Sequence, residues 1–320
     1  MKPATKPATK IVIVGGAGGI GSSVAFNLVR EDLDAEVVLV DTRPESITSH
    51  TMDLEDIVAL GGARRVRGGD TSDLADADVV VISAAVPLRA NTSRMVFLHD
   101  NAAVLRDVVA PLAGSSFHGT VMVMTNPVDP LVTWVHELTG LPRQRVVGYT
   151  LNDSLRFRFG ISDALGVRPQ RVDAWVIGEH GEHQVPLYSR VRVDGEAVSL
   201  TPDQRAVAQD YMDNWYVRHV ALNSGRTSTW SSGLGGARMV RAIATGQPNP
   251  FPASVMLDGE YGLRGVSVSV PAVLARSGVV EVVEWDLDEE EASALAKAAR
   301  VVQGVTDELR RSFEQAPVAN

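Results

Sequence analysis

A short apolar segment that opens onto a cluster of glycines constrains the fold of this chain more than any other feature. Residues 11–14 read Ile-Val-Ile-Val, which is typical of a buried strand, and the segment after residue 21 carries apolar side chains at helical spacing. Between them lies the sequence GGAGGIG, which contains a G-x-G-x-x-G pattern formed by Gly16, Gly18 and Gly21. The order of strand, glycine turn and helix predicts a loop that binds the phosphates of a dinucleotide.

Each glycine of the pattern has a different expected role. Gly16 would permit a tight turn, Gly18 would let the backbone approach a pyrophosphate, and Gly21 would let the helix pack closely on the strand. The helix would begin at Gly19 and Ile20, whose free N–H groups would face the phosphate oxygens. A glycine turn that only reverses the chain is the structural alternative at this point.

An acidic residue at the end of the next apolar run supports the dinucleotide interpretation. Residues 37–40 are apolar and Asp41 follows them, twenty residues after Gly21. A carboxylate in this position accepts hydrogen bonds from both ribose hydroxyls of the adenosine half and repels a 2′-phosphate. The sequence therefore predicts NAD as the cofactor in preference to NADP.

Three further apolar runs alternate with helical segments in the first half of the chain, at residues 79–82, 121–124 and 145–147. Continuous apolar runs suit strands that helices cover on both faces. Residues 10–149 are therefore expected to form an NAD-binding domain, an α/β unit with a Rossmann-type doubly wound parallel sheet. Residues 1–9 are expected to be a disordered tail, and residues 150–320 a C-terminal α+β domain that carries the catalytic and substrate-binding groups.

The second half has a different pattern of elements. They are a helix from Ser154, a strand at 172–177, a hairpin at 191–198 that turns at Asp194-Gly195, helices at 202–222 and 228–244, strands at 255–257 and 266–270, and an amphipathic helix at 288–313. No low-complexity linker separates the two halves.

Composition argues against several classes of partner. The net charge is −9, whereas a nucleic-acid surface needs a basic stripe. No apolar run approaches the roughly 20 residues that cross a bilayer. The chain has no cysteine, which excludes disulfides and thiolate metal ligands. We therefore expect a cytoplasmic protein that binds neither nucleic acid nor membranes.

His180 has the most distinctive surroundings of the histidines, since it follows a predicted strand and lies in Gly178-Glu179-His180-Gly181. A histidine on a short constrained loop suits proton transfer near neutral pH, and a structural turn is the alternative.

Asp153 and Arg156 lie three residues apart at the start of a predicted helix and project from one face. One interpretation is a local ion pair. The other is that each residue has a function of its own, with Asp153 orienting a histidine and Arg156 binding a substrate carboxylate.

Two loops at the carboxyl ends of predicted strands carry further candidates. Arg94 ends a polar stretch that would close over a site, and Asn126 lies in Thr125-Asn126-Pro127-Val128-Asp129. For Arg94, the structural alternative is a solvated connection. For Asn126, it is a helix cap or an Asx turn.

No metal site is expected, because His180 and His183 lack a helical His-Glu-x-x-His pattern. Serine hydrolysis is not expected either, since no G-x-S-x-G occurs.

Taken together, the motifs GGAGGIG, TNPVD, NDSLRFR, GEHGEHQVP and EYGLRGVSVSVP resemble the malate/L-lactate dehydrogenase family in order and spacing. The resemblance covers nearly the whole chain from Lys10. It implies that Asp153 and His180 form a proton-relay pair and that Arg156 binds the C1 carboxylate. It also implies that Arg94 polarises the reacting carbonyl from a mobile loop.

The same resemblance implies that Asn126 contacts the substrate and holds the nicotinamide side, that Ser228 lies beside the substrate, and that the chain forms a homodimer or homotetramer. One position departs from the family. Six residues before the loop arginine, malate enzymes carry arginine and lactate enzymes usually glutamine, but this chain has Leu88, which cannot pair with a distal carboxylate. Arg89 is adjacent, and Arg226 stands where relatives generally carry glycine; either would supply the missing charge.

The resemblance predicts an NAD-dependent L-2-hydroxy-acid dehydrogenase, with malate and oxaloacetate as the leading pair of substrates. Lactate or an aliphatic or otherwise unusual 2-oxo acid is the alternative, favoured by Leu88. A catalytically silent NAD-binding protein is an alternative from another class, because a fold does not determine a function. An NAD-dependent glycosidase would need a metal site, and the chain lacks cysteine as a ligand.

Overall fold

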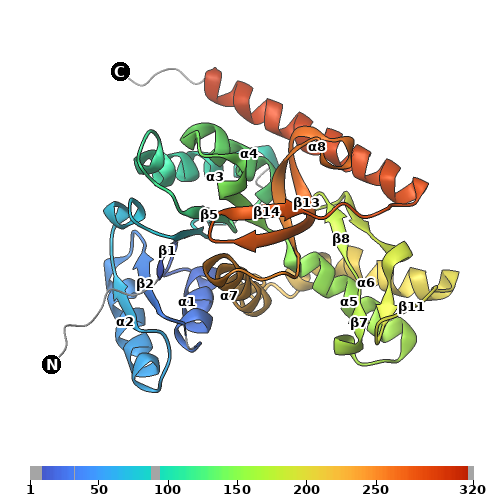
Figure 1. Cartoon of the computed structure of the whole chain (residues 1–320), viewed down its shortest axis with the longest axis horizontal. Coiled ribbons are helices and arrows are strands. Elements are labelled where there is room, and N and C mark those ends of the chain that lie inside the picture. The colour runs from blue at the N-terminus through green and yellow to red at the C-terminus, as the bar shows by residue number, and fades with distance from the viewer. Residues whose placement is uncertain (1–8, 32, 88–93, 316–320) are drawn as a thin grey trace.

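The structure is a computed structural model that describes residues 9–31, 33–87 and 94–315. Within these residues an eleven-stranded sheet runs through the molecule and helices cover its two faces (Figure 1). The first six strands of the sheet are parallel, in the spatial order β3 (Arg65–Gly68), β2 (Ala35–Val40), β1 (Thr9–Val14), β4 (Val79–Ile82), β5 (Thr120–Val123) and β6 (Val146–Tyr149). The predicted doubly wound parallel sheet is confirmed; β3 was not predicted.

The apolar runs of the sequence are explained by burial on both faces of the sheet. Ile11 and Ile13 on β1 pack in a cluster with α1 (Gly19–Val29), α2 (Pro44–Ala59) and α7 (Thr229–Thr245). Val12 and Val14 point to the opposite face, where they pack with α3 (Arg94–Val109) and α4 (Val128–Thr139). Because successive side chains of a strand alternate between faces, a strand covered on both sides must be apolar at every position.

The sheet continues without a break into the second half of the chain. It adds the antiparallel strands β12 (Phe251–Asp258), β13 (Arg264–Ala275), β8 (Val176–Gly178) and β9 (Gln184–Pro186), while β14 (Gly278–Val282) pairs with β13. Next to it, α5 (Leu151–Leu165) and α6 (Pro202–Ala221) pack around Phe157 against a three-stranded sheet of β7 (Val172–Asp173), β10 (Arg192–Val193) and β11 (Glu196–Ala197). The long α8 (Glu289–Glu314) crosses the outside of the molecule (Figure 1).

One predicted strand is wrong. The segment 172–177 forms two strands, β7 and β8, that belong to different sheets. Val172 and Ala174 are buried in the cluster around Phe157, whereas Ile177 is buried in the central core. The segment therefore passes between two hydrophobic clusters and cannot pair as one strand. The predicted hairpin turn is confirmed, with φ of 52° at Asp194 and 85° at Gly195.

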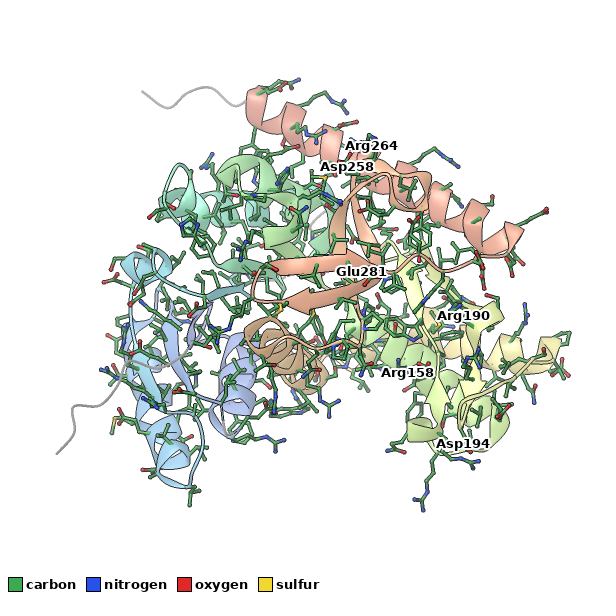
Figure 2. All side chains as sticks on the ribbon, in the orientation of Figure 1. Arg158, Arg190, Asp194, Asp258, Arg264 and Glu281 are labelled. Carbon is green, nitrogen blue, oxygen red and sulfur yellow. The ribbon has the colours of Figure 1, made fainter. Side chains whose placement is uncertain are left out.

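Cation–π contacts join separate parts of the second half. The guanidinium carbon of Arg190, which is labelled in Figure 2, lies 4.1 Å from the centre of the Trp285 ring. This contact links the segment before β10 to the segment before α8.

No helix in the described part of the chain is long and apolar enough to cross a membrane.

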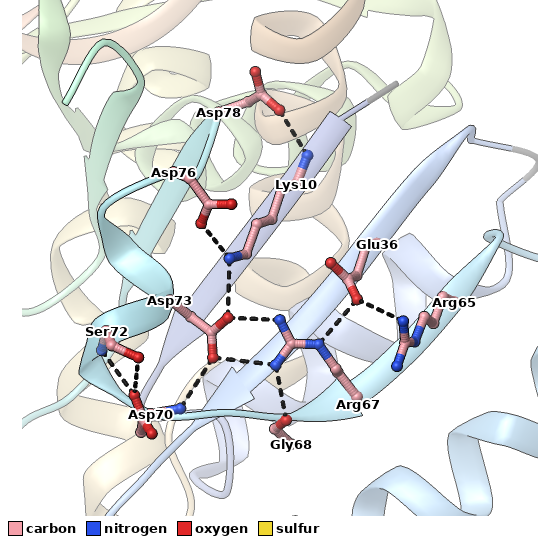
Figure 3. Close-up of polar contacts among 10 residues, drawn as sticks. All are labelled: Lys10, Glu36, Arg65, Arg67, Gly68, Asp70, Ser72, Asp73, Asp76 and Asp78. Atoms are coloured by element: carbon pink, nitrogen blue, oxygen red, sulfur yellow. Dashed lines mark hydrogen bonds and ion pairs between the residues drawn. The ribbon is translucent and has the colours of Figure 1, made fainter. Parts of the chain in front are cut away.

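A network of charged side chains ties the first three strands to the turn before β4 (Figure 3). Lys10 on β1 donates from Nζ to Asp73 Oδ1 at 2.9 Å and also to Asp76. Arg67 on β3 donates to Glu36 on β2 at 2.9 Å and to Asp73 Oδ1 at 2.5 Å. The hydrogen bonds from Arg67 outweigh the effect of burial and, together with Lys10, hold the pKa of Asp73 well below its usual range.

We expect Asp73→Asn to lower the free energy of unfolding by about 1–3 kcal/mol at pH 7, because hydrogen bonds to charged groups contribute about that much. A pKa depressed by folding contributes stability above the unfolded-state value of about 4, and the contribution is lost as the pH falls toward the folded-state pKa. The difference between wild type and variant should therefore shrink between about pH 5 and pH 2 in urea denaturation. Asp107→Asn, at an exposed ion pair with Arg106, is the matched control and should change stability by less than about 0.5 kcal/mol. Equal losses in the two variants would contradict a structural role for the network.

Candidate active site

The glycine turn between β1 and α1 is closely packed. Gly15 adopts a φ of +86°, and a Cβ there would lie 2.6 Å from the backbone nitrogen of Ala84. The residue with left-handed backbone is thus Gly15, one position before the Gly16 of the sequence prediction; Gly16 instead lies against Leu39 on β2. A Cβ at Gly21 would lie 2.2 Å from the carbonyl oxygen of Gly15, so only glycine lets the helix pack this closely on the turn.

The start of α1 has the properties that a dinucleotide pyrophosphate needs. Gly18 is the N-cap and no side chain caps it, so the first N–H groups of the helix are not taken by a capping side chain. Asp41, at the end of β2, accepts a hydrogen bond from the N–H of Ala17 at 3.1 Å and one from Arg43 Nε at 3.1 Å. Burial alone would raise the pKa of Asp41, but these hydrogen bonds outweigh it and hold the pKa below its usual value. The carboxylate therefore stays ionised, and the residues of this turn fit NAD.

Asp153 and His180 come from different elements and meet in a partly buried hydrogen bond. Asp153 lies in the first turn of α5 and His180 follows β8. The Nδ1 of His180 is 2.5 Å from Oδ2 of Asp153. Because Nδ1 is engaged with a carboxylate, Nε2 is the ring nitrogen that remains for proton exchange. Nε2 makes no hydrogen bond with the described residues.

The loop that carries His180 is held at several points. Gly178 at the end of β8 has a φ of +86°, a conformation that favours glycine. The backbone N–H of His180 donates to Oδ2 of Asp129 at 2.7 Å. Glu179, which is buried, accepts hydrogen bonds from the N–H and Nδ1 of His183 at 3.0 and 2.9 Å. These contacts fix the backbone on both sides of the histidine.

Two buried carboxyl groups influence the protonation of His180. Desolvation alone would lower the pKa of His180, but the charge and hydrogen bond of Asp153 outweigh it, and Asp129 acts in the same direction. The pKa of His180 is therefore raised above its usual value of about 6.5. Asp129 is fully buried, and burial raises its pKa to about 6. The site therefore stabilises a protonated imidazole.

Arg156 lies one helical turn after Asp153 and is surrounded by three different groups. Its Nη1 is 3.6 Å from Oδ1 of Asp153, and its Nη2 donates to Ser228 Oγ at 3.3 Å. Its guanidinium carbon lies 4.0 Å from the centre of the Trp215 ring. Desolvation lowers the pKa of Arg156, although Asp153 opposes the effect, and an arginine remains charged at neutral pH. The arrangement provides a partly buried, oriented cation next to the histidine pair.

A buried hydrogen-bond network places Ser228 beside Arg156. The hydroxyl of Tyr149 donates to Oδ1 of Asn152 at 2.9 Å and lies 3.2 Å from the carbonyl oxygen of Ser231. Asn152 in turn donates to Ser232 Oγ at 2.8 Å. These contacts join the start of α5 to the first turn of α7, whose N-cap is Ser228.

The glycine turn and the site near Arg156 are neighbours through α7. A Cβ at Gly19 would lie 3.4 Å from the side-chain oxygen of Thr229, the residue after Ser228. The first turn of α7 therefore touches both the expected phosphate loop and the partly buried Arg156. This places the predicted cofactor residues and the predicted substrate residues on adjoining elements.

The remaining predicted residues are described to different extents. Asn126 is exposed at the end of β5, and its carbonyl oxygen accepts from Asn101 at 2.8 Å. Arg94 is the first residue of α3. Leu88 and Arg89 lie outside the described residues. Arg226 is exposed, and its guanidinium carbon lies 5.0 Å from the centre of the Trp230 ring. Within the described part of the chain it forms no hydrogen bond or ion pair with Asp153, Arg156 or His180.

Three residues that contact the predicted site residues were not predicted from the sequence. Asn101 is fully buried on α3 and also accepts a hydrogen bond from the N–H of Val86, so it joins the loops after β4 and β5. A polar residue on the apolar stripe of a helix was a signal for it. Asp129 was an acidic residue in an otherwise apolar segment, which signals a buried partner. Trp215 had no such signal, because polar and apolar residues do not segregate along α6.

Two family models match the chain. The model of the lactate/malate dehydrogenase NAD binding domain matches residues 9–148, and that of the alpha/beta C-terminal domain matches residues 150–312. The chain belongs to the lactate/malate dehydrogenase family. It is therefore an NAD-dependent oxidoreductase that acts on 2-hydroxy acids, and the resemblance seen in the motifs is confirmed.

Individual members of the lactate/malate dehydrogenase family resemble the chain over nearly its whole length. L-lactate dehydrogenase 1 of Staphylococcus aureus is 33% identical over 306 residues, which covers 93% of this chain and 96% of that protein. The solved malate dehydrogenase of Cryptosporidium parvum has a TM-score of 0.88 and 29% identity, and the minor L-lactate dehydrogenase of Enterococcus mundtii has a TM-score of 0.87 and 29% identity. Each of these two comparisons covers 95% of this chain and 99% of the other. Relatives thus include both lactate and malate enzymes.

We expect Asp41→Ser to shift the cofactor preference from NADH toward NADPH. The substitution removes a carboxylate that repels a 2′-phosphate and releases Arg43, which can then pair with that phosphate. The loss of charge-assisted hydrogen bonds to ribose should lower kcat/KM for NADH by about 10- to 100-fold. Steady-state kinetics with both cofactors measure the ratio. Asp41→Ser combined with Arg43→Ala is the control and should lose NADH activity without gaining NADPH activity; an unchanged preference in Asp41→Ser would contradict the role of Asp41.

Proposed function

We propose that this enzyme interconverts an L-2-hydroxy acid and the corresponding 2-oxo acid, with His180 as the group that exchanges the proton and a substrate whose side group is uncharged. The observation that carries the proposal is the 2.5 Å contact between His180 Nδ1 and Asp153 Oδ2, with Arg156 3.6 Å from the other oxygen of the same carboxylate. This arrangement supplies a proton and a carboxylate-binding cation side by side.

The proton is the part of the reaction that the protein itself supplies. When bound, NADH supplies the hydride that reduces C2 of the 2-oxo acid. The carbonyl oxygen then needs one proton, which protonated His180 gives up from Nε2. Asp153 keeps the imidazole in one orientation and stabilises its protonated form. In the opposite direction, neutral His180 accepts the hydroxyl proton.

Arg156 is the proposed partner of the substrate's C1 carboxylate. A guanidinium pairs with a carboxylate through two parallel hydrogen bonds, which fixes the orientation of the substrate as well as its position. Ser228, 3.3 Å from Nη2, marks the side of the guanidinium that faces α7. From the family resemblance we further propose that Arg94 polarises the reacting carbonyl and that Asn126 contacts substrate and nicotinamide.

The proposal of an uncharged side group rests on the charges available to a second carboxylate. Leu88, at the position that distinguishes malate from lactate enzymes, carries no charge. Among the described residues, Arg226 was the candidate to replace it, but its guanidinium lies over the exposed ring of Trp230. A substrate such as pyruvate or a larger aliphatic 2-oxo acid needs no second cation. These observations favour it over oxaloacetate, which was the leading expectation from the motifs.

Oxaloacetate remains the second candidate, because malate dehydrogenases are among the similar structures and Arg89 is adjacent to Leu88 in the sequence. For this substrate, Arg226 would have to leave Trp230, or Arg89 would have to face the site. The two candidates predict different orders of kcat/KM, so kinetics decide between them.

A panel of 2-oxo acids should show higher kcat/KM for pyruvate or a branched aliphatic 2-oxo acid than for oxaloacetate. Leu88→Arg should reverse the order, because hydrogen bonds between charged groups add about 1.5–3 kcal/mol, or roughly 10- to 100-fold. Oxidation of NADH is followed by its absorbance. A wild type that prefers oxaloacetate, and loses that preference in Arg226→Ala or Arg89→Ala, would contradict the uncharged side group. No turnover of any 2-oxo acid by folded protein that binds NADH would support a silent NAD-binding protein instead.

The pH dependence of reduction tests the histidine pair. Reduction needs protonated His180, so kcat/KM should be constant at low pH and fall as the pH rises through the pKa of His180, which lies above its usual value of about 6.5. Asp153→Asn removes the charge that raises this pKa. In that variant the fall should move to lower pH, and kcat should drop by about 100- to 10,000-fold.

His180→Asn is the companion variant. It should lose several orders of magnitude in kcat while the Kd for NADH stays within about twofold, since it removes the proton donor and leaves the glycine turn intact. Activity that survives in His180→Asn would rule out His180 as the proton donor.

The assembly and location of the protein remain predictions. We propose a homodimer or homotetramer, and the exposed apolar side chains of Phe159 on α5 and of Val207, Tyr216, Val217 and Val220 on α6 support this proposal. Large apolar groups on neighbouring helices are typical of surfaces that another chain covers. Light scattering measures the assembly. A cytoplasmic location remains an expectation from the sequence.

A further inference from the structure

Trp215 on α6 lies against the guanidinium group of Arg156 on α5. The two residues belong to α6 and α5, which lie side by side in the second half of the chain (Figure 1). The distance from the guanidinium carbon of Arg156 to the ring centre is 4.0 Å. The side chain of Arg156 is largely buried, with 19% of its surface exposed, so the cation and the ring meet where water screens little.

A ring that covers one face of a guanidinium has a defined effect on its hydrogen bonding. All N–H groups of arginine lie in the guanidinium plane, so a ring against the face leaves them free to meet a carboxylate at the edge. The ring also restricts rotation of the long side chain. Arg156 therefore loses less conformational freedom when a carboxylate binds than it would without the ring.

Further contacts connect Trp215 to the loop that carries Ser228. The rings of Trp215 and His219, one helical turn apart, are stacked at 5.0 Å with an interplanar angle of 12°. His219 Nε2 lies 3.0 Å from the carbonyl oxygen of Arg226. Two residues later, Ser228 accepts a hydrogen bond from Arg156. The contacts therefore run from Arg156 through Trp215 and His219 to the backbone of Arg226, and Ser228 then contacts Arg156 again.

These contacts hold the exposed segment between α6 and Ser228 in a fixed position beside Arg156. The residues between α6 and Ser228 are exposed, and Asn223 and Gly225 have φ of 46° and 66°. Without the contact between His219 Nε2 and the carbonyl oxygen of Arg226, the backbone of this connection would be held mainly by its two ends. With it, the backbone at Arg226 is joined to α6, and Ser228 is held at hydrogen-bond distance from Arg156.

We propose that Trp215 is a positioning residue for substrate binding, which holds the Arg156 guanidinium edge-on to the C1 carboxylate and, through His219, holds the loop that presents Ser228. The inference rests on the proposed role of Arg156 as the carboxylate-binding group. It assigns no contact between Trp215 and the reacting atoms. Its loss should therefore weaken binding of every 2-oxo acid by a similar factor and leave the chemical step nearly unchanged.

Trp215→Leu tests the proposal by the separation of KM from kcat. We expect KM for the preferred 2-oxo acid to rise about 3- to 30-fold, the range that corresponds to loss of a desolvated cation–π contact, with kcat within about twofold of wild type. Trp215→Phe keeps an aromatic face and should return KM to within about threefold of wild type. The Kd for NADH, measured first without the 2-oxo acid, should be unchanged in both variants.

Trp175→Leu is the matched control, because the guanidinium carbon of Arg158, on the same helix as Arg156, lies 5.8 Å from the centre of the Trp175 ring. This variant should lower Tm and leave KM within about twofold of wild type, which separates stability from positioning. A folded Trp215→Leu with unchanged KM, or a Trp215→Phe as impaired as Trp215→Leu, would overturn the proposal.

Arg156→Lys distinguishes failure of this inference from failure of the proposed function. If Arg156→Lys raises KM strongly while Trp215→Leu does not, only the role of Trp215 is wrong. If Arg156→Lys leaves KM unchanged, the carboxylate-binding role of Arg156 is wrong and the inference falls with it.

Discussion

The hydrogen bond between Asp153 and His180 joins two elements that lie far apart in the sequence, and the arrangement of the site depends on it. A buried carboxylate is costly unless it is paired and hydrogen-bonded. Asp153 satisfies this condition with the imidazole of His180 on one oxygen and the guanidinium of Arg156 on the other. One carboxyl group thus sets the orientation of the imidazole and the position of a cation, and it raises the pKa of the histidine above its usual value.

The surrounding fold brings the partners of this carboxylate together. The sheet carries β8 into the same layer as the parallel strands, so His180 reaches the start of α5 and α4 at once. The buried network of Tyr149 and Asn152 holds the first turn of α7 against α5, and that turn also contacts the glycine turn. The glycine turn, His180 and Arg156 therefore lie on adjoining elements rather than on one.

The features that could be predicted from the sequence are those with a local physical cause. Strands buried on both faces must be apolar throughout, and a tight turn followed by a closely packed helix must contain glycine. The strands β1, β2 and β4 and the turn before α1 could therefore be predicted. β3 was not, because an edge strand of four residues with two arginines has no apolar pattern. The segment 172–177 has one continuous pattern, but it divides between two clusters that only the folded chain defines.

The same distinction applies to the site. Asp153 and Arg156 were predicted to share a face because three residues make about one helical turn, and their 3.6 Å separation agrees with that prediction. The partnership of His180 with Asp129, and of Arg156 with Trp215, depends on helices that are distant in sequence. No periodicity within α4 or α6 contains that information. The unusual Leu88 was visible at once, but its consequence for the substrate depends on where the other arginines lie.

A nuclear magnetic resonance titration of His180 with ¹⁵N-labelled histidine tests most directly whether Asp153 orients the imidazole and stabilises its protonated form. We expect the neutral ring to carry its proton on Nδ1, facing Asp153, and the pKa of His180 to lie above about 6.5 and to fall in Asp153→Asn. A neutral ring protonated on Nε2, or a pKa below about 6.5 that Asp153→Asn leaves unchanged, would contradict it.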